Sequence, residues 1–380
     1  MSWKKIGLQK KQNGKFGNMS FSNIYNGKKV VLTGHTGFKG SWMAIWLKAL
    51  GAEVYGYALP PYSQMDNFVT CGLASHVNHL EGDVRDAQKL KSYFQEIQPD
   101  FAFHLAAQPL VLLSYENPVE TFSTNVMGTV NFFEAVRSTP SIRAAVNVTT
   151  DKCYDNKEWV WGYRENDPMG GKDPYSASKG CSELVTASYL DSFFRGGSKC
   201  SIASARAGNV IGGGDWAADR IVPDYFRAYV KDQKLEIRNP YATRPWQHVL
   251  EPLSGYLALG EALYNHGEVF SGGWNFGPED IANYSVQELI DKMLSIDPKG
   301  GYIIPENTDK LHEAVLLKLD ISKAVMKLKW KPVLSFDETV SFTLSGYKAD
   351  LDGHDVYSKR VDQISLYTKT AAEKSIKWAR

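Results

Sequence analysis

The sequence predicts an α/β fold in which a doubly wound parallel sheet is joined to a smaller, mainly C-terminal lobe. Between residues 29 and 206, short apolar runs alternate with segments whose apolar residues recur at helical spacing. Strands that alternate with helices favour a parallel sheet with helices on both faces. A turn with three spaced glycines follows the first apolar run, and beyond residue 207 glycine, tryptophan and proline become frequent.

The expected elements follow from these periodicities in chain order. We expect strands at 29–32, 53–59, 79–83, 101–107, 143–150 and 201–206. We expect helices at 42–50, 86–97, 118–138 and 176–194, and an isolated helix at 286–294. The chain then divides into a flexible N-terminal extension (1–25), a doubly wound domain (26–206) and a smaller domain interleaved with it (207–380).

Composition excludes several classes of function. The 380 residues are 43% hydrophobic and 22% charged, with a net charge of +1, so bulk attraction to nucleic acid or to an anionic membrane is not expected. No apolar run approaches the ~20 residues that span a bilayer, and we expect a cytoplasmic protein. The cysteines are scattered, so we expect neither a disulfide framework nor a metal site. They are Cys71, Cys153, Cys181 and Cys200.

The glycine turn is the first candidate site. Gly34, Gly37 and Gly40 lie between a predicted strand and a predicted helix. Glycine allows the backbone to approach a pyrophosphate, whose charge suits a helix N-terminus. A purely structural tight turn is the alternative, but the position in an alternating α/β domain favours a Rossmann-like dinucleotide site. The second strand is followed by no acid before Asp66 and by no arginine, which favours NAD over NADP only modestly.

A tyrosine and a lysine form the second candidate site. Tyr175 and Lys179 are four residues apart at the start of a predicted helix, so they share a face. An ammonium about 4 Å from the phenol supplies roughly 4 kcal/mol at an effective dielectric of about 20, or about three pKa units. Such a shift would bring the phenol near neutrality as a general base. A surface Tyr–Lys pair is the alternative.

The end of the fifth predicted strand carries further polar residues. Thr150, Asp151 and Lys152 follow Thr149 at the carboxyl end of that strand, where parallel sheets form their ligand crevice. Thr150 is placed to hydrogen-bond a reacting hydroxyl. Asp151 and Lys152 would add an acid and a base that simple hydride transfer does not need. A solvated loop pair is the alternative.

Together these residues resemble the extended short-chain dehydrogenase/reductase family. The family-wide matches are Thr33–Gly40, Gly82–Asp86, His104–Ala107, Thr124–Thr129 and Tyr175 with Lys179. Narrower matches resemble the nucleotide-sugar 4,6-dehydratases that act on CDP-glucose. These are Thr150–Tyr154, Glu158–Glu165, Arg206–Trp216 and Arg244–Pro252. The resemblance runs from about residue 25 to about residue 330, and implies an NAD-binding Rossmann domain followed by a nucleotide-sugar domain.

The resemblance implies an internal redox cycle. Tyr175 would take the 4-hydroxyl proton while NAD accepts the C4 hydride, Asp151 would protonate the departing C6 hydroxyl, and the hydride would return to C6. The dTDP-glucose dehydratases have a glutamate after that aspartate to remove the C5 proton, whereas this chain has Lys152. The identity of the C5 base therefore stays open. Leu112 is a further departure, because relatives often have arginine there.

The resemblance also assigns binding residues. The cofactor would contact Gly34, Thr36, Gly37, Phe38, Lys39, Gly40, Asp83, Val84, Ala106, Ala107, Gln108, Tyr175 and Lys179. The substrate would contact Asn209, Arg220, Ile221, Arg244, His248 and Trp161. Arginine suits phosphate because its planar fork pairs with the oxygens. A surface or domain-interface charge is the alternative for Asn209, Arg220 and Arg244. Trp159 and Trp161 could cover the sugar site, and core packing is the alternative for both.

Three functions are compatible with these residues. The first is dehydration of CDP-glucose, the second is epimerisation or reduction of a nucleotide sugar, and the third is a cofactor-binding scaffold without activity. The acid and base at Asp151 and Lys152 argue against an epimerase, and the presence of both Tyr175 and Lys179 argues against a scaffold. The family also implies a homodimer through the helix at 176–194, although ordinary core packing explains its apolar side equally well.

Overall fold

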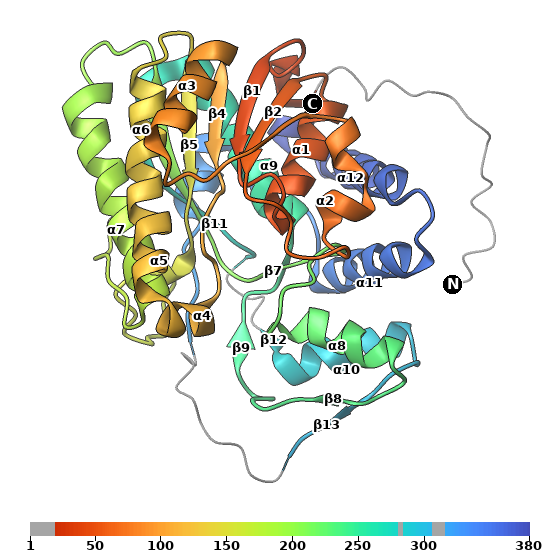
Figure 1. The fold of residues 1–380 in the computed structure, drawn as a ribbon. Helices are drawn as coiled ribbons and strands as arrows, with labels where there is room; N and C mark the ends of the chain where they lie inside the picture. The colour runs from red at the N-terminus through yellow and green to blue at the C-terminus, as the bar shows by residue number, and fades with distance from the viewer. Residues whose placement is uncertain (1–19, 280–283, 306–315) are drawn as a thin grey trace.

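Seven parallel strands form the central sheet of the protein (Figure 1). The structure is a computed structural model that describes residues 20–279, 284–305 and 316–380. The sheet order is β11-β6-β5-β4-β1-β2-β3. The strands are β1 (Lys29–Thr33), β2 (Glu53–Ala58), β3 (Asn78–Glu81), β4 (Phe101–His104), β5 (Ala144–Val148), β6 (Ser201–Ala207) and β11 (Gly272–Phe276). The six predicted strands are confirmed, and β11 is an addition from the C-terminal half.

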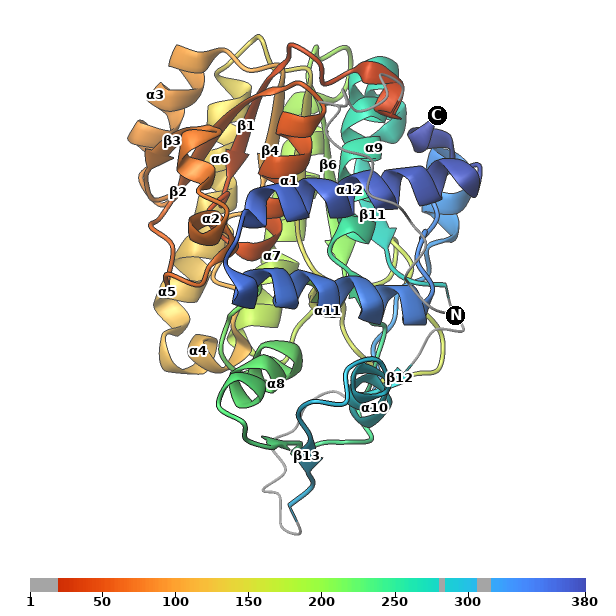
Figure 2. The same ribbon diagram turned by 90° about the vertical axis from the view of Figure 1, so that its right-hand side faces the viewer.

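Helices cover both faces of this sheet (Figure 2). One layer consists of α1 (Phe38–Ala49), α9 (Leu250–His266) and α12 (Val356–Glu373). The opposite layer consists of α3 (Ala87–Ile97), α6 (Gly128–Arg137) and α7 (Pro174–Tyr189). Each layer closes its own hydrophobic core against the strands. Within the described residues, no helix has the length and apolar character that a membrane span requires.

Two predicted helices contain π-helical turns. The helix predicted at 118–138 consists of α5 (Pro118–Phe122), η3 (Ser123–Met127) and α6. The helix predicted at 176–194 begins two residues earlier as α7 and ends in η5 (Leu190–Phe194). Such turns interrupt the regular hydrogen bonding of a helix and occur often near functional sites. A 3.6-residue periodicity does not distinguish them from an uninterrupted helix.

A smaller group of elements lies beyond the carboxyl edge of the sheet (Figure 1). Its own hydrophobic core joins α8, α10 and one side of α11. The elements are β7 (Val210–Ile211), α8 (Ile221–Val230), β8 (Leu235–Glu236), β9 (Thr243–Arg244), β10 (Gln247–His248), β12 (Tyr284–Ser285), α10 (Val286–Ile296), β13 (Tyr302–Ile303) and α11 (Phe336–Asp352). The helix predicted at 286–294 is α10. The division into domains at residues 206 and 207 stays a prediction.

Short elements complete the chain and connect its ends. They are η1 (Ser20–Asn23), α2 (Asn67–Thr70), η2 (Leu73–Ser75), α4 (Val111–Glu116), η4 (Asp151–Cys153), η6 (Gly267–Phe270), η7 (Ala324–Leu328) and η8 (Lys377–Ala379).

Phe21 stacks on Trp378 at 4.9 Å, and the Tyr25 hydroxyl donates to the Leu257 carbonyl at 2.6 Å. The predicted flexible extension therefore does not include residues 20–25, and residues 1–19 lie outside the described residues.

The glycine turn needs glycine at two positions for different reasons. Gly34 has a φ of 75°, and a Cβ there would lie 2.6 Å from the Ala106 backbone nitrogen. A Cβ on Gly40 would lie 2.1 Å from the Gly34 carbonyl oxygen, at the close approach of α1 to the turn. Both contacts are with backbone atoms, which cannot move aside without changing the turn.

We predict that Gly40→Ala destabilises the protein by about 2–3 kcal/mol or more, because the added methyl overlaps the Gly34 carbonyl. Gly37→Ala is the matched control in the same turn, since its Cβ would lie 3.4 Å from that oxygen. Denaturant unfolding of both variants checks this. Equal stability of the two variants would contradict the role of close packing at Gly40.

Candidate active site

The crevice lies where the strand order reverses between β1 and β4. The glycine turn follows β1, Ala106 and Ala107 follow β4, and Thr150 and Asp151 follow β5, so all lie at the carboxyl edge of the sheet. Ligands of doubly wound sheets bind at this edge. The fold therefore brings together three of the sequence-predicted groups that are far apart in the chain.

The glycine turn presents an uncapped helix to the crevice. Gly37 is the N-cap of α1 and has no side-chain cap, so the first backbone N–H groups of the helix are available to an anion. The Thr36 hydroxyl donates to the Leu59 carbonyl at 2.9 Å and fixes the turn against the end of β2. Phe38 lies against Gly212 of the smaller lobe. The turn has the backbone arrangement that a pyrophosphate requires.

The segment after β4 is held by amide hydrogen bonds. Gln108 donates its backbone N–H to Asn125 at 2.9 Å, and its side-chain amide bonds Leu110 and Thr121. Asn125 in turn donates to the Ser178 hydroxyl of α7 at 2.9 Å. The Gln108 side-chain amide is thus hydrogen-bonded within the protein. The predicted contact of Gln108 with the cofactor would therefore be made by its backbone.

Asp83 and Val84 lie at the far end of the crevice beside β2. The Asp83 carboxylate accepts from the Arg85 backbone N–H at 2.8 Å and from its Nε at 2.8 Å. Burial raises the pKa of Asp83, but the hydrogen bonds from Arg85 outweigh it and the pKa lies below its usual value. Val84 is buried beneath Gly128. Asp66 accepts hydrogen bonds from Tyr62 and Ser63 in its own turn.

Tyr175 is positioned by the first turn of α7. Asp173 caps this helix by accepting the Ser176 N–H at 2.9 Å, and the Tyr175 N–H donates to the Ser114 hydroxyl at 3.1 Å. Burial raises the pKa of Tyr175 to about 12, although a hydrogen bond with Thr150 lowers it. Tyr175 and Thr150 are therefore in contact, as the sequence predicts for a shared reacting hydroxyl.

Lys179 lies one turn after Tyr175 on α7, and its effect on the Tyr175 pKa stays a prediction. The Lys179 ammonium donates to the Val148 carbonyl at 3.2 Å and is not among the causes of the Tyr175 shift. Burial lowers the pKa of Lys179 to about 8, which Glu183 partly opposes. Four-residue spacing places both side chains on one face of α7, and the Lys179 amine reaches the carboxyl end of β5.

Asp151 is a buried acid with one free acceptor. It is 2% exposed, and its Oδ1 accepts from the Thr150 hydroxyl at 3.0 Å. Within the described residues, its Oδ2 has no hydrogen-bond partner. That atom faces Gly208, where a Cβ would come within 2.9 Å of it. A buried carboxylate oxygen without a partner is costly, which is typical of a site built for a ligand or a reaction.

The structure adds Tyr256 and Asp215, which the sequence analysis did not assign, as neighbours of the predicted residues Lys39 and Arg220. Lys39 extends from α1 to the hydroxyl of Tyr256 on α9, at 3.5 Å. Arg220 forms an ion pair with Asp215 at 2.8 Å, and its charge acts on both Tyr175 and Lys39. Asp215 lies in the quoted Arg206–Trp216 motif, whereas no sequence pattern brings α9 to Lys39.

The remaining substrate-predicted residues occupy different places. Arg220 and Ile221 lie at the start of α8, and Asn209 accepts the Gln247 N–H at 3.3 Å through its carbonyl. Arg244 lies in β9 and donates to the Thr243 carbonyl. His248 is fully buried with its ring edge against Trp42 at 5.8 Å, and burial lowers its pKa to about 3. In this structure His248 is part of the core, so its substrate contact stays a prediction.

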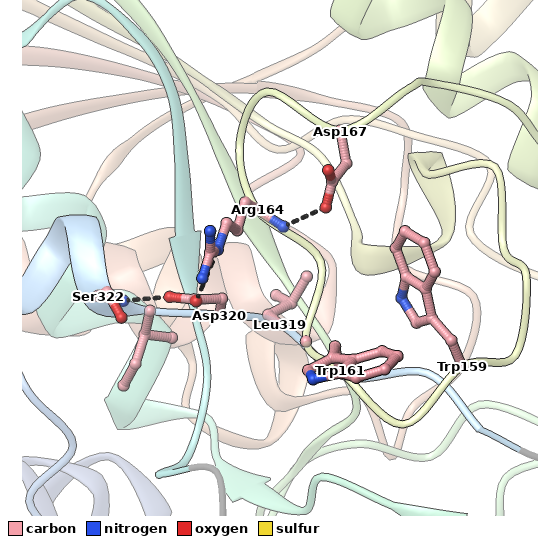
Figure 3. Close-up of a pocket in the computed structure, with 9 residues that line it drawn as sticks. Trp159, Trp161, Arg164, Asp167, Leu319, Asp320 and Ser322 are labelled. Carbon is pink, nitrogen blue, oxygen red and sulfur yellow. Dashed lines mark hydrogen bonds and ion pairs between the residues drawn. The ribbon is translucent and has the colours of Figure 1, made fainter.

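Trp161 lies in a separate pocket of about 540 Å³ (Figure 3). Trp161 is 70% exposed, and Trp159 stacks on Tyr163 at 5.1 Å. Arg164 forms an ion pair with Asp320 across the pocket at 3.2 Å. The lining residues are Trp159, Trp161, Gly162, Arg164, Asp167, Leu319, Asp320, Ile321 and Ser322. None of them is among the groups gathered around Tyr175 and Asp151, so a sugar contact by Trp161 stays a prediction.

A buried polar network lies under the end of β5. Arg206 at the end of β6 pairs with Glu183 of α7 at 2.8 Å, with both side chains almost fully buried. Glu183 also accepts from Thr149 and Ser204. Arg206 also donates to the Tyr154 hydroxyl at 2.6 Å. The network connects the strand that carries Thr150 to the helix that carries Tyr175.

We predict that Lys179→Met raises the free energy of unfolding at pH 7 by about 1–3 kcal/mol while abolishing activity. The folded-state pKa of about 8 lies below the ordinary lysine pKa of 10.5, so the folded state binds fewer protons and the buried ammonium is destabilising below pH 8. The gain should therefore shrink as the pH rises from 8 to 10.5. Lys48→Met on α1 is the control. A pH-independent difference would contradict the assignment.

Comparison with known proteins places these features in a family. The family model for GDP-mannose 4,6 dehydratase matches residues 31–343. CDP-glucose 4,6-dehydratase of Salmonella typhimurium is 50% identical over 349 residues, which cover 91% of this chain and 97% of that protein. dTDP-glucose 4,6-dehydratase of Xanthomonas campestris is 24% identical over 83% of this chain and 92% of its own.

A solved structure supports the fold. UDP-glucose-4-epimerase from Stenotrophomonas maltophila, with bound NAD, matches with a TM-score of 0.74 and 19% identity over 86% of this chain and 99% of that one. The predicted Rossmann-type fold and the prediction of an enzyme are confirmed. The chain belongs to the family of nucleotide-sugar 4,6-dehydratases that the matching model describes.

Proposed function

We propose that this protein catalyses the NAD-dependent 4,6-dehydration of CDP-glucose to CDP-4-keto-6-deoxyglucose in the cytoplasm. The product would enter deoxysugar and O-antigen-type polysaccharide biosynthesis. The 50% identity to a CDP-glucose 4,6-dehydratase over 91% of the chain supports this substrate. The observation that carries the reaction type is Asp151, a buried acid with a free acceptor beside Thr150 and Tyr175.

The crevice fits NAD. A Cβ at Gly34 or Gly40 would clash with backbone atoms, so glycine keeps the turn tightly packed, and the uncapped N-terminus of α1 offers its N–H groups to a pyrophosphate. Asp83 and Val84 would meet the adenosine end, and Ala106, Ala107 and Gln108 would line the groove. When bound, NAD supplies reversible hydride acceptance. Asn209, Arg220 and Arg244 would hold the substrate pyrophosphate.

The residues of this chain then perform the proton transfers. Thr150 and Tyr175 would both hydrogen-bond the sugar 4-hydroxyl, and Tyr175 would remove its proton. The unliganded phenol has a pKa of about 12, so the ligands must lower it for this step. The ketone at C4 would acidify the C5 proton, and Asp151 would protonate the C6 hydroxyl as it leaves. An epimerase has no use for that acid.

The test incubates purified protein with CDP-glucose and NAD and measures the product by mass spectrometry. We expect loss of one water and no net NADH, because the hydride returns to C6. Asp151→Asn should slow water loss by about 100-fold or more, the usual contribution of a general acid. Unchanged mass with CDP-glucose would refute the proposal, and inversion at C4 without water loss would favour an epimerase.

We also propose that the protein is a homodimer through the outer faces of α4–α7. These helices contact one another on one side of the molecule (Figure 1). Their exposed apolar side chains are Leu112, Tyr115, Val119, Phe122, Met127, Leu184 and Phe193. An apolar surface of this kind is typical of an interface with a second copy.

Light scattering with size-exclusion chromatography tests the dimer. We predict that Val119→Glu combined with Leu184→Glu converts it to a monomer, because the charges would be buried without partners. Leu366→Glu is the control, since Leu366 is 53% exposed on α12, which belongs to the layer on the other face of the sheet. A monomeric wild-type protein, or a double variant that still dimerises, would refute this interface.

A further inference from the structure

The segment between β6 and α8 runs along one side of the crevice. At its start, Gly208 lies against Asp151, because a Cβ there would come within 2.9 Å of the Asp151 Oδ2. Further on, a Cβ on Gly212 would lie 3.4 Å from the ring of Phe38, in the first turn of α1. The segment then leads to Arg220, the N-cap of α8. The chain thus passes from the proposed acid to the glycine-turn helix before it reaches Arg220.

Arg220 is held by a carboxylate that is almost fully buried. Its Nη1 donates to the Oδ2 of Asp215 at 2.8 Å, and the side chains are 35% exposed for Arg220 and 5% exposed for Asp215. Within the described residues, the Arg220 side chain bonds no other group. A guanidinium has five N–H donors, so the others are left for an anion. Their direction depends on where Asp215 is held.

Tyr347 contacts both sides of this ion pair. It lies on α11, which packs between α12 and α8 (Figure 2). Its buried hydroxyl donates to the backbone carbonyl of Asp215 at 2.5 Å. Its ring stacks on Phe226 of α8 at 4.1 Å, with an angle of 6° between the ring planes. One side chain therefore contacts the segment that carries the carboxylate and the helix that begins beside Arg220.

The loop before this carboxylate is fixed by further buried groups. Asp350 of α11 accepts the backbone N–H of Gly214 at 2.7 Å. Asp350 also pairs with Arg360 of α12, and both side chains are fully buried. Trp42 of α1 donates its indole N–H to the carbonyl of Gly213 at 2.9 Å. Three helices from distant parts of the sequence thus hold the loop, so the loss of one further contact leaves it anchored.

We propose that Tyr347 is a positioning residue that sets the affinity of the protein for the diphosphate of its substrate, acting through Asp215 and Arg220. The inference rests on the proposed dehydration of a nucleotide hexose, in which Arg220 holds the pyrophosphate. A guanidinium pairs with phosphate oxygens through a planar fork, so binding depends on its orientation. Tyr347 is fully buried and lies beyond residues 31–343, which the family model matches.

Two tyrosine variants separate positioning from stability. Tyr347→Phe removes the bond to Asp215 and keeps the ring that stacks on Phe226. Tyr25→Phe is the matched control, because the buried Tyr25 hydroxyl also donates to a backbone carbonyl, that of Leu257 on α9, at 2.6 Å. Each variant loses one buried hydrogen bond of the same kind, so we expect similar decreases in the denaturant midpoint. A difference in substrate affinity between them therefore reports positioning.

The measurements are KM and kcat for CDP-glucose at saturating NAD, and the Kd of CDP by calorimetry. We expect Tyr347→Phe to raise KM and Kd about 3–10-fold, the usual net effect of one hydrogen bond. Its kcat should stay within about twofold of wild type, because the diphosphate is bound equally in the ground state and the transition state. Tyr25→Phe should match wild type in all three constants.

A double variant tests whether the effect passes through the arginine. Arg220→Met should raise the Kd of CDP at least about 10-fold, and adding Tyr347→Phe to it should raise the Kd no further. An unchanged Kd in either single variant, an equal rise in Tyr25→Phe, or additive effects in the double variant would overturn the inference. No water loss from CDP-glucose by wild type would refute the proposed function instead, and this inference with it.

Discussion

The ion pair between Arg206 and Glu183 is the constraint on which the site depends. Two charges removed from water are stabilising only when their geometry is good and their remaining hydrogen bonds are satisfied. Here Glu183 accepts from Thr149, Ser204 and Arg206, and Arg206 also donates to Tyr154 and to the Glu165 carbonyl. Because these groups come from β5, β6, α7 and the segment that follows η4, the pair fixes the relative positions of Thr150 and Tyr175.

The amines of the crevice are treated differently from this pair. Arg206 is in contact with a carboxylate, whereas within the described residues Lys39 bonds the Tyr256 hydroxyl and Lys179 the Val148 carbonyl, and both amines have lowered pKa values. Their burial costs stability below their pKa values, so the protein keeps them for a reason other than folding. The charges of Arg206 and Glu183 therefore neutralise each other in a fixed geometry, whereas the amines of Lys39 and Lys179 can exchange protons.

Much of the fold could be predicted from sequence because its signals are local. Buried apolar runs and the glycine turn give the first six strands and their order along the chain. Strand β11 was missed because it begins with Gly272 and Gly273, and because the helical segments α9 and η6 that lead into it were not predicted from the sequence. The contact of Tyr175 with Thr150 could be predicted from where the strand ends and the helix begins. The contacts of Lys179 with Val148 and of Lys39 with Tyr256 depend on tertiary packing, which residue spacing does not encode.

The chain closes on itself at its two ends, which has a consequence for biosynthesis. Helix α12 packs on α1, and Trp378 contacts Phe21 and Trp46. Helix α1 leaves the ribosome early, but part of its apolar side is covered only when α12 and Trp378 have followed. During translation, the apolar side of α1 is exposed to solvent, where chaperones or neighbouring nascent chains can bind it. The packing of α1 is thus completed only after α12 and Trp378 have been synthesised.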